Sequence, residues 1–219
     1  MLSGMVTILG RPNVGKSTLL NSLVGQKVSI VSHKPQTTRH RIQGVLHHEQ
    51  TQIVFVDTPG LHRAQKTALN RVMNEAAAGA VGGVDLILFV IEAGKFTEED
   101  ENVLAKLEGV DTPVGLLINK VDRVTDKEKL LPELEKRGAL RNFAFVMPLS
   151  AQKKTNLKPL VEEILKRMPE GDPLYPQDMI VGHDESFGVA ELIREKLTRT
   201  LHQELPYSLT VQIEEFKRE

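Results

Sequence analysis

The sequence predicts a doubly wound α/β fold whose sheet is mostly parallel. Apolar, strand-like segments alternate with amphipathic, helix-like segments through most of the 219-residue chain, as in crossover units on a parallel sheet. A short polar turn joins two of the strand-like segments, which predicts one antiparallel edge. The expected strands are 6–9, 42–47, 53–56, 85–91, 116–118 and 143–149, and the expected helices are 19–24, 98–107, 126–136 and 157–165.

A glycine-rich segment directly follows the first expected strand and fits the pattern GxxxxGK[ST]. Two glycines let the backbone curl without Cβ clashes, so the turn can present the free N–H groups of a helix N-terminus to an anion. The lysine adds a positive charge for the outer phosphates, and the serine can bind Mg²⁺. This is a phosphate-binding loop, so the fold class is that of P-loop NTPases. The expected phosphate contacts are Gly10, Arg11, Pro12, Asn13, Val14, Gly15, Lys16, Ser17 and Thr18.

A second loop motif, Asp57-Thr58-Pro59-Gly60, follows the strand expected over 53–56. An aspartate at the tip of a strand can hold Mg²⁺ through water, and the Gly60 N–H can reach a γ-phosphate. The motif by itself is an ordinary turn. Its place after a strand, beyond a phosphate-binding loop, favours a functional interpretation.

Two further motifs indicate which base is bound. Asn119-Lys120-Val121-Asp122 follows a third strand, and guanine presents N1–H and N2–H₂ donors that the Asp122 carboxylate can accept, whereas adenine has no matching pair. Ser150-Ala151 closes the last strand, where a backbone N–H could bind guanine O6. Because the carboxyl ends of parallel strands meet at one edge of a sheet, all four motifs should converge there. The sequence therefore predicts a site for a guanine nucleotide.

The order of these motifs resembles the Ras-like GTPases of the translation-factor-related class. Within that class, Asn13–Ser17 together with Gln36–Arg41 resembles the Era family of bacterial ribosome-assembly GTPases, and further matches at 57–62, 193–197 and 204–208 extend the resemblance over essentially the whole chain. The resemblance implies hydrolysis of GTP to GDP with Mg²⁺. It also implies a magnesium-binding threonine in the pair Thr37-Thr38; Thr38 is the first choice and Thr37 the alternative.

One departure from the Ras pattern affects the expected rate. Leu61 stands where Ras-type enzymes carry a water-orienting glutamine after Gly60, and a leucine cannot orient water, so we expect slow intrinsic hydrolysis. In related GTPases a K⁺ ion held partly by the loop asparagine replaces an arginine finger, which implies Asn13 as a K⁺ ligand, with carbonyls of the loop 32–37 as the others. The expected catalytic residues are Lys16, Thr38, Gly60 and Asn13.

The chain divides at a segment rich in proline. Three prolines and a glycine lie within 169–176, so we expect a GTPase domain over 1–168, a linker over 169–180 and a further region over 181–219. In that region Ala190, Ile193, Leu197 and Leu201 share a helix face, and 209–213 alternates like a strand. By resemblance these are the first helix and strand of a type II KH RNA-binding domain, and we expect the chain to end inside it, because the GXXG loop is absent.

Composition restricts partners and location. The formal net charge is −1, there is no cysteine, and no apolar stretch reaches the roughly 18 residues of a membrane span. We expect a cytoplasmic protein, with a monomer favoured, and peripheral association with the inner face of the cell membrane stays open. By resemblance the partners are small-subunit ribosomal RNA and the assembling small subunit. The segment 181–219 holds five Lys/Arg against eight Asp/Glu, so RNA binding by this chain should be weak.

Two classes of function fit these observations. In the first, GTP hydrolysis switches the conformation of the segments around Thr38 and Asp57 and thereby regulates RNA binding. In the second, the protein is an interaction or assembly protein that uses GTP or GDP mainly as a structural ligand. Nucleotide-dependent affinity for the ribosomal subunit would distinguish them.

Overall fold

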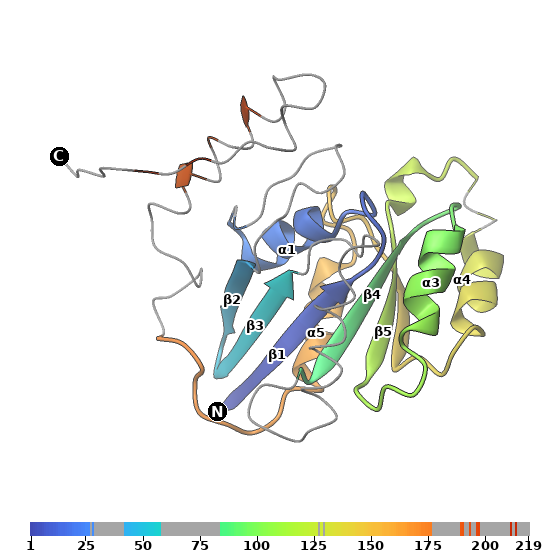
Figure 1. The fold of residues 1–219 in the computed structure, drawn as a ribbon. Coiled ribbons are helices and arrows are strands. Elements are labelled where there is room, and N and C mark those ends of the chain that lie inside the picture. The colour runs from blue at the N-terminus through green and yellow to red at the C-terminus, as the bar shows by residue number, and fades with distance from the viewer. Residues whose placement is uncertain are drawn as a thin grey trace.

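The computed structural model describes residues 1–26, 28, 42–57, 84–126, 128 and 130–176, and the single positions 189, 190, 193, 196, 197, 211 and 213. Within these residues the fold is a six-stranded sheet in the order β2-β3-β1-β4-β5-β6, with helices on both faces (Figure 1). The strands are β1 (Leu2–Leu9), β2 (Ile42–His48), β3 (Thr51–Asp57), β4 (Leu86–Glu92), β5 (Val114–Asn119) and β6 (Phe145–Pro148).

The sheet is parallel except at one edge. β2 pairs antiparallel with β3 through a hairpin, as its short polar turn predicts, while β3, β1, β4, β5 and β6 all run in the same direction. Their carboxyl ends therefore lie along a single edge, which is the upper one in Figure 1. The doubly wound, mostly parallel sheet expected of a P-loop NTPase is thus confirmed.

Among the described residues, two helices cover each face of the sheet. Buried side chains of α1 (Lys16–Val24) and α5 (Leu157–Leu165) join one apolar cluster with β1, β3 and β4. On the other face α3 (Glu98–Ala105) contributes Val103 to a second cluster, against which Leu134 of α4 (Leu130–Gly138) packs. Successive strand residues point to opposite faces, which is why β4 supplies Leu88 to the first cluster and Phe89 to the second. No described helix is both long enough and apolar enough to cross a membrane.

Some boundaries differ from those expected. β1 begins at Leu2, four residues before the expected start, because its first residues pair with Thr51 and Gln52 of β3. The helix expected over 126–136 begins only at Leu130. Pro132 explains this shift, since proline is tolerated in a first helical turn but breaks a helix interior. Asp126 instead accepts a hydrogen bond from the Glu128 N–H at 3.2 Å, in a turn ahead of the helix.

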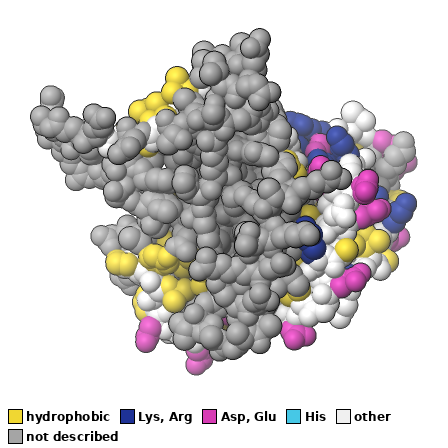
Figure 2. Space-filling view, in the orientation of Figure 1, with side chains coloured by type: hydrophobic (Ala, Val, Ile, Leu, Met, Phe, Trp, Pro, Cys, Tyr) yellow, Lys and Arg dark blue, Asp and Glu magenta, His cyan; other side chains and the backbone are white. Residues whose placement is uncertain are grey.

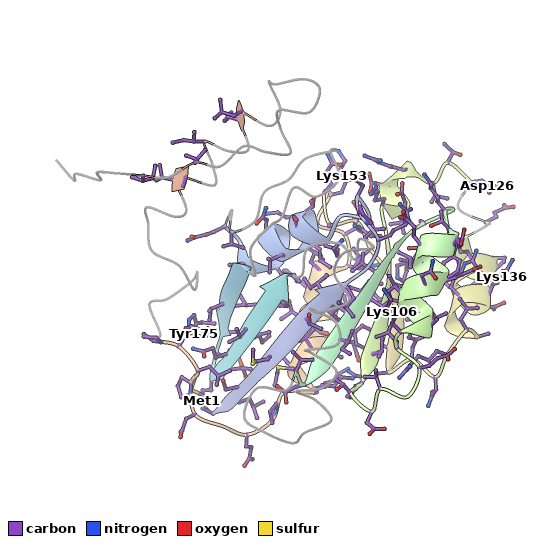
Figure 3. All side chains as sticks on the ribbon, viewed as in Figure 1. Met1, Lys106, Asp126, Lys136, Lys153 and Tyr175 are labelled. Atoms are coloured by element: carbon purple, nitrogen blue, oxygen red, sulfur yellow. The ribbon has the colours of Figure 1, made fainter. Side chains whose placement is uncertain are left out.

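The described part of the linker is attached to the sheet. Residues 169–176 form no helix or strand, as expected, yet Ser3 N–H donates to Pro169 O at 3.0 Å and Gly171 N–H donates to Met1 O at 3.1 Å. The buried Gln52 side chain then bonds both backbone groups of Tyr175, donating to its oxygen at 2.7 Å and accepting from its nitrogen at 2.9 Å. Met1 and Tyr175 lie at the end of the sheet opposite Lys153 (Figure 3).

The region expected to begin a KH domain falls almost entirely outside the described residues. The described positions Ala190, Ile193 and Leu197 are helical, in agreement with the helix expected there. Val211 and Ile213 are not in a strand, contrary to the pattern over 209–213. An alternating pattern forms a strand only where a partner strand pairs with its backbone, and the described sheet offers none to this segment.

Candidate nucleotide-binding site

The loop from Gly10 to Gly15 connects β1 to α1 with the backbone geometry that its sequence predicts. Gly10 and Gly15 have φ values of 153° and 104°, and a Cβ on Gly10 would come within 2.3 Å of the Val90 carbonyl oxygen. Asn13 also adopts a left-handed conformation, with φ of 64°. Gly15 is the N-cap of α1 and has no side chain that could cap the helix. The first N–H groups of the helix therefore face the loop.

Lys16, the lysine of this loop, lies at the base of α1 and is buried apart from 8% of its surface. Its ammonium donates to the carbonyl oxygens of Gly10 at 3.0 Å and Arg11 at 2.9 Å. These bonds hold the positive charge inside the curve of the loop, where an anion on the adjacent helix N-terminus would meet it.

Asn119, at the end of β5, connects three of the predicted loops. Its Nδ2 donates to Val14 O at 2.8 Å, and its Oδ1 accepts from Lys120 N at 2.8 Å and from Ala151 N at 3.0 Å. The side chain is 2% exposed, so these bonds form away from water. The phosphate loop and the two loops expected to bind the base are therefore fixed to one amide group.

The loop expected to bind the base is a short 3₁₀ helix, η1 (Val121–Arg123). Lys120 precedes it with φ of 65°, and Val121 N–H donates to Leu149 O at 3.2 Å. Asp122 is exposed on this turn, where its carboxylate can receive a ligand. Ser150 is fully buried, and its backbone N–H donates to Thr155 O at 3.3 Å. The Ala151 N–H donates to Asn119, so guanine O6 would have to share or replace that bond.

Two carboxylates behind the phosphate loop were not predicted from the sequence. Glu92, at the end of β4, accepts from the Lys120 ammonium at 2.9 Å and from the Arg11 guanidinium at 3.2 Å. Asp100, fully buried in α3, accepts from Arg11 Nε at 3.0 Å and completes a capping box with Thr97. A usable signal was present, since Glu92 ends a strand just as Asp57 and Asn119 do, and Thr97-x-x-Asp100 fits a capping pattern.

The electrostatics of Glu92 agree with this geometry. Partial burial raises its pKa, but the hydrogen bond and charge of Lys120 and the charge of Arg11 outweigh burial and hold the pKa below the ordinary value of 4.5. The ion pairs are therefore complete above pH 4.5 and weaken as the pH falls through the lower, folded-state pKa.

Most of the remaining predicted residues belong to the segments around Thr38 and Asp57. Asp57 ends β3, and its backbone pairs in register with Ile8 of β1. β3 is thus the direct neighbour of the strand that leads into the phosphate loop. Thr18 lies in the first turn of α1. Thr37, Thr38, Gly60 and Leu61 lie outside the described residues.

Comparison with known proteins agrees with this arrangement. Residues 5–120 match the protein family described as 50S ribosome-binding GTPase. GTPase Era of Yersinia enterocolitica is 52% identical over 213 residues, which are 97% of this chain and 70% of that protein. The chain belongs to the Era family of GTPases. GTPase Era of Yersinia pestis strain Pestoides F is 51% identical, again over 97% of this chain and 70% of its own length.

Solved structures of Era family proteins resemble the whole chain. A tyrosine-to-alanine variant of Aquifex aeolicus Era bound to GDP·AlF₄⁻ is 39% identical, with a TM-score of 0.85 over 100% of this chain and 74% of that one. An Era complex with MgGDPNP and nucleotides 1506–1542 of 16S ribosomal RNA is also 39% identical, with a TM-score of 0.86 and the same coverage. Those Era proteins carry guanine nucleotides on the fold described above.

Replacing Gly15 with alanine should strongly impair nucleotide binding. Its φ of +104° is unfavourable for any residue with a Cβ, and that Cβ would lie 2.3 Å from Asn119 Nδ2, so the loop or the amide must move. Strain of this kind costs roughly 1–3 kcal/mol, so we expect about a tenfold or larger loss of GDP affinity. Isothermal titration calorimetry measures the effect, with Gly109→Ala as control: Gly109 has φ of +72° but no atom within 4 Å of the added Cβ. Equal GDP affinities in both variants would contradict this prediction.

Proposed function

We propose that this chain binds GTP and GDP with Mg²⁺ and hydrolyses GTP to GDP and inorganic phosphate as a conformational switch. The observation that carries the proposal is the Asn119 side chain, which bonds the phosphate loop at Val14 and the base loops at Lys120 and Ala151. A single buried amide thus sets the distance between a phosphate site and a base site, which is what a nucleotide requires. Membership of a GTPase family supports the reaction.

The residues proposed to hold Mg²⁺ at the phosphate end carry oxygen donors. Ser17 is the second residue of α1, directly after Lys16, and β3 ends in Asp57, which pairs with Ile8 near the end of β1. With Thr38, which lies outside the described residues, Ser17 and Asp57 would supply oxygen ligands, which this hard cation prefers. When bound, the ion supplies positive charge to the outer phosphate oxygens.

Hydrolysis adds water to the terminal phosphate. The water oxygen forms a bond to the γ-phosphorus and the bond from that phosphorus to the β–γ bridging oxygen breaks. GDP leaves with the electron pair of that bond, and the water hydrogens stay on the released phosphate or pass to solvent. Lys16 stabilises the outer phosphates through its charge, and the Gly60 N–H binds the γ-phosphate. Leu61 cannot position the water, so the intrinsic rate should be slow.

The potassium dependence of hydrolysis gives a direct prediction. Asn13 is exposed at the turn of the phosphate loop, and the ammonium of Lys120 already occupies its backbone oxygen at 2.6 Å, which leaves its side-chain amide to reach an ion. We expect faster hydrolysis in K⁺ than in Na⁺ at equal ionic strength, because a cation beside the phosphates stabilises developing charge. Asn13→Ala should remove the preference, and Asn102→Ala on the exposed face of α3 should keep it. A phosphate-release assay that gave equal rates in both salts would exclude this role of K⁺.

Small-subunit ribosomal RNA is the proposed macromolecular partner, reached through the region 181–219 as the beginning of a KH domain after a linker over 169–180. The structure of an Era protein with part of 16S RNA supports the proposal. Figure 2 shows one small group of basic side chains at the upper right of the described surface, with an acidic side chain among them, and the segment 181–219 holds five Lys/Arg against eight Asp/Glu. RNA binding by this chain should therefore be weak. A cytoplasmic location stays a prediction.

One set of assays tests these proposals. The purified chain should hydrolyse GTP but not ATP, Lys16→Ala should lose hydrolysis, and Lys106→Ala at the exposed end of α3 should retain it. Binding of a labelled RNA from the 3′ end of small-subunit ribosomal RNA is then compared with GDP and with a non-hydrolysable GTP analogue. An RNA affinity that differs between the two nucleotides supports the switch. Equal RNA affinities, together with a protein that is stable only when nucleotide is bound, would favour a structural ligand.

A further inference from the structure

Glu92 forms ion pairs with one residue of the phosphate loop and one residue of the base-binding loop. Its Oε2 receives the Lys120 ammonium at 2.9 Å and the Arg11 guanidinium at 3.2 Å. Arg11 belongs to the phosphate loop, and Lys120 begins the turn that carries Asp122. One carboxylate oxygen therefore joins the two loops from behind.

Both cations are also fixed at a second point. The Lys120 ammonium donates to Asn13 O at 2.6 Å, so it bonds the phosphate loop as well as Glu92. Arg11 donates through Nε to Asp100 at 3.0 Å, and the Arg11 side chain is only 8% exposed. Arg11 is thus held against α3 through Asp100, and the backbone from Arg11 to Asn13 is held at both of its ends.

We propose that Glu92 is a positioning residue that sets the spacing between the phosphate loop and the base-binding loop, acting through Arg11 and Lys120. This inference rests on the proposed function of the site. Without the carboxylate, two positive groups that meet at one oxygen atom would repel each other at short range in a partly buried setting. The loops would then lose the spacing that a bound nucleotide needs, although the sheet beneath them would be unchanged.

The loop that carries Glu92 is itself anchored. Ala93 N–H donates to Asn119 O at 2.8 Å, and Gly94 N–H donates to the Glu133 carboxylate of α4 at 2.9 Å. The Glu92 side chain is 19% exposed, so a neutral isostere can be solvated and should be accommodated without loss of the fold. Glu92→Gln therefore tests the charge with little change in shape.

The main measurement is the dissociation rate of a fluorescent GDP analogue from the full chain by stopped-flow. We expect Glu92→Gln to dissociate about tenfold or more faster than wild type, since a charge-assisted bond is worth at least about a factor of ten. Glu92→Asp keeps the charge and should recover part of the difference. A Glu92→Asp variant that dissociates as fast as Glu92→Gln would overturn the role of the charge.

The chain provides a matched control in Glu163, on the helix α5. Its carboxylate also pairs with one lysine and one arginine, Lys166 at 2.5 Å and Arg167 at 2.7 Å, and Arg167 bonds Ala144 O ahead of β6, at the opposite end of the sheet from the nucleotide loops. Glu163→Gln should dissociate GDP at the wild-type rate. An equal acceleration in both variants would mean that any lost ion pair loosens the site, and would overturn the proposal.

A double-mutant cycle separates positioning from general stability. If Glu92 acts partly through Lys120, then Glu92→Gln should accelerate dissociation by a smaller factor in a Lys120→Ala background than in wild type, with the remainder acting through Arg11, whereas independent effects would multiply. Multiplying effects would overturn the route through Lys120. A wild-type chain without guanine nucleotide binding would overturn the proposed function itself, and wild-type binding with an unchanged Glu92→Gln rate would overturn this inference alone.

Discussion

Replacing Asn119 with alanine should reduce guanine nucleotide affinity by about a hundredfold or more, while the sheet still folds. The change removes the group that donates to Val14 O and accepts from Lys120 N and Ala151 N. Each buried polar group left without its partner costs roughly 1–3 kcal/mol, so the loss should reach several kcal/mol. Because all three partners lie in loops of the nucleotide site, most of this loss should appear in binding.

Calorimetric titration with GDP measures the affinity, and urea unfolding of the nucleotide-free protein measures the effect on the fold. Asn142→Ala is a suitable control, because Asn142 is exposed in the connection between α4 and β6. An Asn119→Ala variant with near wild-type GDP affinity would show that the three loops are held together by other contacts. A large loss of unfolding free energy with little loss of affinity would assign Asn119 to the core instead of the site.

The phosphate and base loops were predictable because each is a short motif directly after an apolar strand. In a parallel sheet that pattern places the loop at the carboxyl edge, so the sequence alone assigns Lys16, Asn119 and Asp122 to one place. The residue types carry the chemistry, since guanine needs an acceptor pair and phosphate needs N–H groups and a cation. Sequence and structure agree on where these loops lie, because that placement follows from the fold class.

The pairing of the acidic side chains behind these loops could not be assigned from the sequence. Asp100 lies in an acidic first turn with Glu98, Glu99 and Glu101, and its capping spacing from Thr97 sets it apart from these neighbours without indicating that it is buried against Arg11. Its partner Arg11 is 89 residues away, and no local pattern reports a contact at that separation. Tertiary packing decides which of several similar residues pairs with Arg11. Sequence motifs therefore identify the residues expected to contact the nucleotide and miss the residues that hold those in place.

The contacts of the linker with the sheet were likewise not predictable from the sequence. Proline content correctly predicts that 169–176 forms no regular element, but not that the segment is bonded to the sheet. Gln52 lies in a β-strand and reads from sequence as an ordinary polar residue. In the structure it is fully buried and pairs with both backbone groups of Tyr175, 123 residues further along the chain. Pairing of this kind depends on where the chain returns after α5, which composition does not report.

Asp122→Asn should exchange guanine for xanthine specificity. The carboxylate is exposed on η1 and can only accept hydrogen bonds, so it suits the N1–H and N2–H₂ donors of guanine, whereas an amide can donate to the oxygen that xanthine carries in place of the amino group. Two charge-assisted bonds at roughly 1.5–3 kcal/mol each correspond to a hundredfold to ten-thousandfold loss of GTP affinity. Competition of GTP and xanthosine triphosphate against a fluorescent GDP analogue measures the exchange.

The matched control for this exchange is Asp111→Asn, because Asp111 is an exposed aspartate in the connection between α3 and β5. It should leave both affinities unchanged, which separates base reading from a general loss of negative charge. The structure also predicts that the Asp122→Asn protein keeps its phosphate site, since Asn119 and Lys120 hold their bonds to Val14 and Asn13 without using Asp122. Xanthosine triphosphate should therefore bind the variant nearly as tightly as GTP binds wild type. Equal GTP affinity in the variant and wild type would mean that guanine is read elsewhere, and would remove the base-binding role from this turn.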